Sequence, residues 1–180
     1  MEEINCVQHF FDAAEKYPNH QAIIAEGQTI SYAELKREVI ATVRYFESKG
    51  IQAGDRVLVF VPMSVDLYRT VLALFSMGAT AVFLDEWVSK KRMEMCCEIA
   101  DCAGFIGVTK AHVLRFFSKE LRAIPITLKI RHKVKADDRF KLFSPKIDHT
   151  ALITFTTGST GIPKAANRTH AFLIAQFEAI

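Results

Sequence analysis

The chain has 180 residues, of which 50% are hydrophobic and 24% charged, as is ordinary for a globular domain with its own core. Its formal net charge of +3 is spread along the sequence, which gives no reason to expect a nucleic acid or an anionic membrane as partner. The start lacks a basic region followed by an apolar stretch, and no run approaches the roughly 18 apolar residues of a membrane span. We therefore expect a cytoplasmic protein without a transmembrane segment.

The first third of the chain predicts two helices around a small hairpin. Residues 6–16 have an amphipathic pattern, and residues 22–32 read as two short strands around a glycine turn. Ser31 and Glu34 have the S-x-x-E spacing of a capping box, which begins a second helix that Gly50 ends.

From residue 56 onward, predicted strands and helices alternate. The apolar runs that predict strands are residues 56–61, 80–85, 104–108, 126–130 and 151–156. Helices are expected from Ser64 to Met77, from Ser89 through the cysteines, over residues 110–121 and over residues 168–180. The charged stretch 131–148 is expected to be a solvated connection. This alternation predicts an α/β fold with a mostly parallel sheet flanked by helices.

The four cysteines, Cys6, Cys96, Cys97 and Cys102, are too few and too bunched for a disulfide framework. A zinc site would need two well-spaced pairs of ligands, and that spacing is missing. We therefore expect reduced, mostly buried thiols.

The stretch TTGSTGIPK, residues 156–164, gathers hydroxyl residues and glycines between a predicted strand and a predicted helix. Glycines let backbone N–H groups converge on an anion, and the N-terminus of a helix adds a favourable dipole. The hydroxyls add donors, and Lys164 adds a cation suited to phosphate. We therefore expect this loop to wrap a polyphosphate.

The spacing excludes two familiar phosphate loops. A Walker loop needs lysine directly after its second glycine, whereas two residues separate Lys164 from Gly161. The G-x-G-x-x-G pattern of a Rossmann loop is absent as well.

The loop resembles the phosphate loop of the adenylate-forming (AMP-binding) enzymes, the superfamily of acyl-CoA synthetases, luciferases and peptide-synthetase adenylation domains. TTGSTGIPK fits that signature at every position, although Ala165 stands where the family often has glycine. Residues 29–35 (TISYAEL) and 54–85 resemble the front end of the same enzymes. The resemblance implies the front part of an adenylate-forming enzyme's N-terminal domain, truncated just after the phosphate loop. It implies N-terminal helices and a small hairpin in residues 1–55 and α/β nucleotide-fold units in residues 56–180.

The resemblance also implies a reaction. In this family a carboxylate attacks the α-phosphate of magnesium-ATP, which gives an acyl-adenylate and pyrophosphate, and CoA or another acceptor then takes the acyl group. The residues implied to hold the ATP phosphates are Thr156, Thr157, Gly158, Ser159, Thr160, Gly161 and Lys164, with Thr160 the candidate for the Mg2+ ion. Residues 82–117 look like the branch that includes olefin β-lactone synthetases and fatty-acyl adenylating enzymes. A fatty acid is therefore the implied substrate.

The apolar pattern of the last segment is still running at residue 180, so we expect a longer parent chain and no complete catalytic set within these residues. An alternative is a truncated, non-catalytic module that binds phosphate or assembles, because an unfinished sheet exposes an edge that favours self-association. We expect His170 to pack or hydrogen-bond locally rather than to catalyse. Asp85 and Glu86 are expected in a turn or cap, and Trp87 in a core or subdomain contact.

Overall fold

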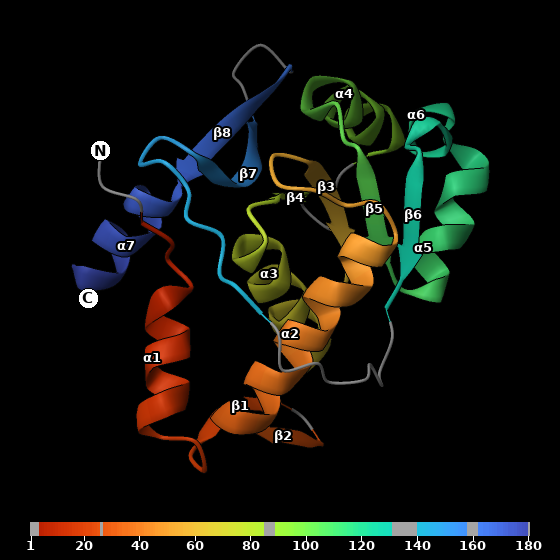
Figure 1. Ribbon diagram of the computed structural model, residues 1–180. Helices are drawn as coiled ribbons and strands as arrows, with labels where there is room; N and C mark the ends of the chain where they lie inside the picture. The colour runs from red at the N-terminus through yellow and green to blue at the C-terminus, as the bar shows by residue number, and fades with distance from the viewer. Residues whose placement is uncertain (1–3, 26, 85–88, 131–139, 158–161, 180) are drawn as a thin grey trace.

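The computed structural model of the protein describes residues 4–25, 27–84, 89–130, 140–157 and 162–179 (Figure 1). Its helices are α1 (Gln8–Lys16), α2 (Tyr32–Ser48), α3 (Val65–Ser76), α4 (Lys90–Ala100), α5 (Thr109–Leu114), the 3-10 turn η1 (Arg115–Phe117), α6 (Lys119–Ala123) and α7 (His170–Glu178). Its strands are β1 (Gln21–Ala25), β2 (Gln28–Ser31), β3 (Arg56–Phe60), β4 (Thr80–Phe83), β5 (Gly104–Gly107), β6 (Ile126–Lys129), β7 (Thr150–Thr157) and β8 (Pro163–Thr169).

Six of these strands form one sheet in the order β6-β5-β3-β4-β7-β8, and β1 and β2 form a separate antiparallel hairpin. All neighbours in the large sheet are parallel except β7 and β8. The predicted α/β class with a mostly parallel sheet is therefore confirmed. Because parallel strands end at the same edge, the carboxyl ends of β3, β4 and β7 lie together, where ligands of open α/β sheets bind.

Helices cover both faces of the sheet, and β3 shows how the sequence arranges this. Val57 and Val59 pack with α2 and α3, while Leu58 packs with α4 and α6 on the other face. Successive side chains of a strand point to opposite faces, so a strand buried on both faces needs the continuous apolar run seen in the sequence.

The predicted helix starts are confirmed in their atomic detail. Ser31 Oγ accepts a hydrogen bond from the N–H of Glu34, and the Glu34 carboxylate accepts one from the N–H of Ser31, so the capping box is complete. Ser89 Oγ likewise accepts from the N–H of Arg92 at the start of α4.

In two segments the structure differs from what the sequence predicts. The helix expected over residues 110–121 is interrupted at Ser118, whose backbone is extended and whose Oγ accepts from the N–H of Leu121 to begin α6. The connection expected to be solvated is only partly so in its described part: Lys141, Lys146 and Asp148 are exposed, but the ring of Phe140 stacks on Phe11 with centroids 5.3 Å apart. The ring of Phe143 lies over Gly78, where a Cβ atom would come within 2.4 Å of the ring. The backbone of Gly78 is also left-handed, at φ +79°, which favours glycine. Residues 131–139 lie outside the described part of the chain.

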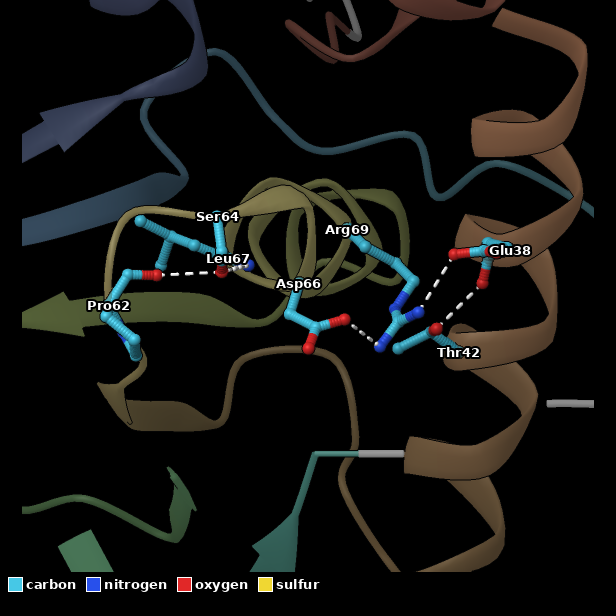
Figure 2. A network of polar contacts seen from close by, with 7 residues as sticks. All are labelled: Glu38, Thr42, Pro62, Ser64, Asp66, Leu67 and Arg69. Carbon is cyan, nitrogen blue, oxygen red and sulfur yellow. Dashed lines mark hydrogen bonds and ion pairs between the residues drawn. The ribbon is translucent and has the colours of Figure 1, made fainter. Parts of the chain in front are cut away.

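A network of charges joins α2 to α3 (Figure 2). The guanidinium of Arg69, whose side chain is 4% exposed, lies 2.8 Å from a Glu38 oxygen on α2 and 2.6 Å from an Asp66 oxygen on its own helix. Thr42 Oγ1 donates to the main-chain oxygen of Glu38 at 2.7 Å, and Ser64 Oγ accepts from the N–H of Leu67 at 3.3 Å. A buried arginine is tolerated only with such partners, so the Arg69–Glu38 ion pair, which crosses from α3 to α2, adds a directional contact to the apolar packing of the two helices.

Replacing Arg69 by methionine keeps much of the aliphatic stem but removes both ion pairs, leaving two carboxylates beside an apolar side chain. We expect Arg69→Met to lower the free energy of unfolding by about 2–3 kcal/mol, measured by urea denaturation. Arg44→Ala is the matched control, because Arg44 pairs with Glu47 at the surface, with side chains 41% and 45% exposed. That pair is worth less than about 1 kcal/mol. Equal losses in the two variants would contradict the structural role of Arg69.

Candidate functional site

The predicted phosphate loop lies at the tip of a β-hairpin. Its first two residues, Thr156 and Thr157, end β7, and Lys164 lies near the start of β8. Thr156 is paired with Lys164 across the hairpin, and Thr157 with Pro163. Gly158, Ser159, Thr160 and Gly161 lie outside the described residues. The parallel pairing of β7 with β4 places this tip at the carboxyl edge of the sheet.

The helix expected over residues 168–180 is confirmed as α7, but a strand that the sequence did not predict separates it from the loop. Residues 163–169 form β8, and α7 begins only at His170, capped by Thr169 Oγ1, which accepts from the N–H of Phe172 at 3.1 Å. Because β8 is antiparallel to β7, it carries the chain back toward the opposite edge of the sheet. The dipole of α7 therefore cannot act on an anion at the loop, and backbone N–H groups, hydroxyls and side-chain cations remain to bind it.

One of these cations comes from another part of the chain. Arg92, in the first turn of α4, donates from its guanidinium to the main-chain oxygen of Thr156 at 3.3 Å. Lys164 is exposed at the same end of the hairpin. The sequence prediction missed Arg92, although Lys90, Lys91 and Arg92 open α4 without an acidic residue in that turn. Because cations are unfavourable at the N-terminus of a helix, three basic residues in this turn are unusual. A bound anion nearby would offset that cost, so this turn was the sequence signal that pointed to Arg92.

A second arginine braces the hairpin along its length. Arg168 of β8 donates to Thr154 Oγ1 of β7, across the strand pair. Arg168 thereby links the two strands, and Arg92 of α4 bonds the end of β7. Such bracing limits the movement of the backbone that would surround a phosphate.

His170 lies at the other end of β8 and is fully buried. Its Nδ1 accepts from the main-chain N–H of Cys6 at 3.3 Å and lies 3.2 Å from Cys6 Sγ. Its ring stacks on His149 and meets Phe75 edge-on, with centroids 5.9 and 5.8 Å away. The prediction that His170 packs is confirmed, but its hydrogen bond reaches the N-terminal segment rather than a neighbour in α7. It thus anchors the base of the hairpin and is remote from the loop.

Among the remaining predicted residues, the structure describes the cysteines. Cys96, Cys97 and Cys102 are buried as expected, and burial raises the pKa of Cys6, Cys97 and Cys102 to about 12, so these thiols are poor nucleophiles. Asp85, Glu86 and Trp87 lie outside the described residues. In the part of the chain that the structure describes, no three His, Cys, Asp or Glu side chains gather as metal ligands. Nor does any helix there have the length and apolarity needed to cross a bilayer.

Comparison with known proteins places these features in a family. Residues 10–180 match the family model described as AMP-binding enzyme. The olefin beta-lactone synthetase of Xanthomonas campestris pv. campestris is 30% identical over 166 residues, covering 83% of this chain and 29% of that protein. The phenyloxazoline synthase MbtB of a Mycobacterium species is 30% identical over 174 residues, covering 95% of this chain and 14% of that protein. The chain thus spans less than a third of the length of these curated relatives.

Solved structures share the fold. Apo MatB from Rhodopseudomonas palustris superposes with a TM-score of 0.81 at 21% identity, covering 97% of this chain and 36% of that chain. The N-terminal subdomain of Klebsiella oxytoca NpsA, in complex with 3-hydroxybenzoyl-AMSN, gives a TM-score of 0.73 at 22% identity, covering 94% of this chain and 42% of that one.

The buried imidazole of His170 predicts acid sensitivity. Burial, and next the charge of nearby His149, lower the pKa of His170 from 6.5 to about 4. The unfolded chain binds this proton below about pH 6.5 whereas the folded chain resists it until about pH 4, so the stability contribution is present above pH 6.5 and is lost as pH falls. We expect His170→Asn to flatten the fall in unfolding free energy between pH 7 and 4 by at most about 3 kcal/mol, measured by urea denaturation. The exposed His20→Gln is the control, and an unchanged pH slope in His170→Asn would refute this prediction.

Proposed function

The chain belongs to the AMP-binding enzyme family, whose members are adenylate-forming ligases. We propose that it supplies the phosphate-binding part of an ATP-dependent carboxylate-activating enzyme. The observation that carries the proposal is the hairpin whose tip holds TTGSTGIPK at the carboxyl edge of the sheet, with Lys164 and Arg92 beside it. In the proposed reaction a carboxylate oxygen attacks the α-phosphorus of ATP, the bond to the β-phosphate oxygen breaks, and pyrophosphate leaves.

The chain's own residues would act on the leaving group. The hydroxyls and N–H groups of residues 156–161 would donate to the β- and γ-phosphate oxygens, and Lys164 would neutralise the charge that grows as pyrophosphate departs. A guanidinium has five N–H donors, so the contact of Arg92 with Thr156 does not exhaust its capacity. Arg92 would therefore both position the end of β7 and add positive charge at the site.

Mg2+ would enter with the nucleotide. Magnesium sites in proteins combine one or two carboxylates with phosphate oxygens and water. The described residues around the hairpin tip offer hydroxyls and carbonyls rather than a carboxylate cluster, which fits an ion held mainly by the phosphates. The assignment of Thr160 to the metal and of the loop residues to the phosphates remains a proposal.

For the acid itself we propose a fatty or β-hydroxy fatty acid. Support comes from residues 82–117 and from the olefin beta-lactone synthetases of Xanthomonas campestris and Stenotrophomonas maltophilia, which are 30% and 28% identical to this chain. Another relative, the delta-poly-L-ornithine synthetase of Acinetobacter baumannii at 26% identity, makes an amino acid the competing substrate. Transfer of the acyl group to CoA or another acceptor, in the cytoplasm, belongs to the same proposal.

The test is ATP–pyrophosphate exchange by the native gene product with fatty, β-hydroxy fatty and amino acids offered separately. We expect exchange that depends on a fatty or β-hydroxy fatty acid, and we expect Lys164→Ala to lower it about tenfold or more because a charge-assisted contact to the leaving group is lost. Lys146→Ala, which removes an exposed lysine away from the hairpin tip, is the control.

The outcomes separate the parts of the proposal. Exchange with amino acids alone would contradict the fatty-acid substrate but support the assignment of the phosphate site. Undiminished exchange by Lys164→Ala would show that Lys164 does not act on the leaving group. No exchange with any acid, together with retained pyrophosphate binding, would favour the non-catalytic phosphate-binding module.

A further inference from the structure

Four large apolar side chains project into solvent from α5 and η1. Val113 is 50% exposed, Leu114 45%, Phe116 73% and Phe117 67%. We call these four residues the aromatic patch. Single exposed apolar residues need no explanation, but adjacent phenylalanines exposed to this extent on a short segment mark an interaction surface.

The fold fixes the outward direction of the patch. On the inner side of the same segment, Ala111 and Leu121 are buried in the core beneath the sheet. The Nε2 atom of His112 lies 3.1 Å from the main-chain oxygen of Leu128. Arg115 Nε donates to the main-chain oxygen of Leu121 at 3.0 Å, and its guanidinium lies over the ring of Phe105 at 5.8 Å. With its inner side held by these contacts, the segment cannot rotate to bury the phenylalanines.

Exposed basic residues lie on the same segment as the patch, and we call them the basic rim. Lys110, Lys119 and Arg122 are exposed on the same segment, whereas its single acid, Glu120, is half-buried and accepts a hydrogen bond from Ser118 Oγ at 3.2 Å. Residues 109–123 contain four basic residues and one acidic residue. Their net charge of +3 equals the formal net charge of the whole chain, so the rest of the sequence is balanced.

We propose that the aromatic patch and its basic rim dock on the surface of an anionic lipid bilayer. Exposed aromatic side chains favour the interface between headgroups and acyl chains, and each nearby lysine or arginine is attracted to anionic headgroups. The charge complementarity identifies this partner, because an apolar patch alone would not distinguish a bilayer from another protein. The proposal goes beyond carboxylate activation, which needs no bilayer, and it departs from the sequence expectation that the charge is evenly spread.

The location of the patch is compatible with the proposed site. The α5–α6 segment lies beside β6, at one edge of the sheet, and β8 forms the other edge (Figure 1). A bilayer bound at the β6 edge would therefore leave the tip of the β7–β8 hairpin accessible to nucleotide.

The test is co-sedimentation of the protein with vesicles of phosphatidylcholine alone and of phosphatidylcholine mixed with phosphatidylglycerol. We expect the protein to bind the mixed vesicles, and we expect this binding to weaken as salt is added. The double variant Phe116→Ser/Phe117→Ser should bind them about tenfold more weakly or worse. Lys119→Gln/Arg122→Gln should weaken binding to the mixed vesicles only. Phe172→Ser, which replaces a phenylalanine 51% exposed on α7, is the matched control and should bind as the unchanged protein does.

Two results would overturn the proposal. One is an absence of binding to mixed vesicles, or binding that Phe116→Ser/Phe117→Ser leaves unchanged. The other is a concentration-dependent oligomer, seen by light scattering without vesicles, that the same double variant disperses while vesicle binding is missing. The second result would make the patch a protein–protein interface. Circular dichroism of each variant checks that these exposed substitutions leave the fold intact.

Discussion

The position of β7 in the sheet is the constraint on which the proposed site depends. Its parallel pairing with β4 brings the end of β7 to the edge where β3 and β4 also end, and its antiparallel pairing with β8 turns the loop into a hairpin tip. Arg92 and Arg168 then brace that hairpin from α4 and from β8. At its base, the partly buried hydrogen bond from the main-chain N–H of Cys6 to His170 ties the start of α7 to the N-terminal segment. The strands on either side of the loop are thus bonded to each other, to α4 and, at their base, to the N-terminal segment.

Local chemistry made much of the fold predictable. The caps at Ser31, Ser64 and Ser89 work through side-chain oxygens that bond N–H groups three residues later, so the sequence alone contains the interaction. The buried strands could be recognised because a strand covered on both faces needs a continuous apolar run, as in β3. The nine-residue loop could be recognised because its spacing is specific, although its predicted contacts with phosphate still await a test.

The features that the sequence did not reveal depend on distant residues. β8, with the sequence PKAANRT, has little intrinsic preference for a strand and forms because β7 offers an edge with which to pair. Arg92 joins the site only through packing of α4 beside the hairpin, 64 residues away in sequence. The basic rim around Phe116 and Phe117 was hidden in a whole-chain charge count, which does not show where charges gather once the chain folds.

The most direct test of the central claim is a nuclear magnetic resonance titration of the isotope-labelled chain with pyrophosphate. Binding at the hairpin tip predicts saturable amide shifts confined to residues 154–165 and the first turn of α4, and their loss in Lys164→Ala. Shifts spread over the basic surface of α5 and α6, or no saturable shifts at all, would contradict the assignment of the phosphate site to the β7–β8 hairpin.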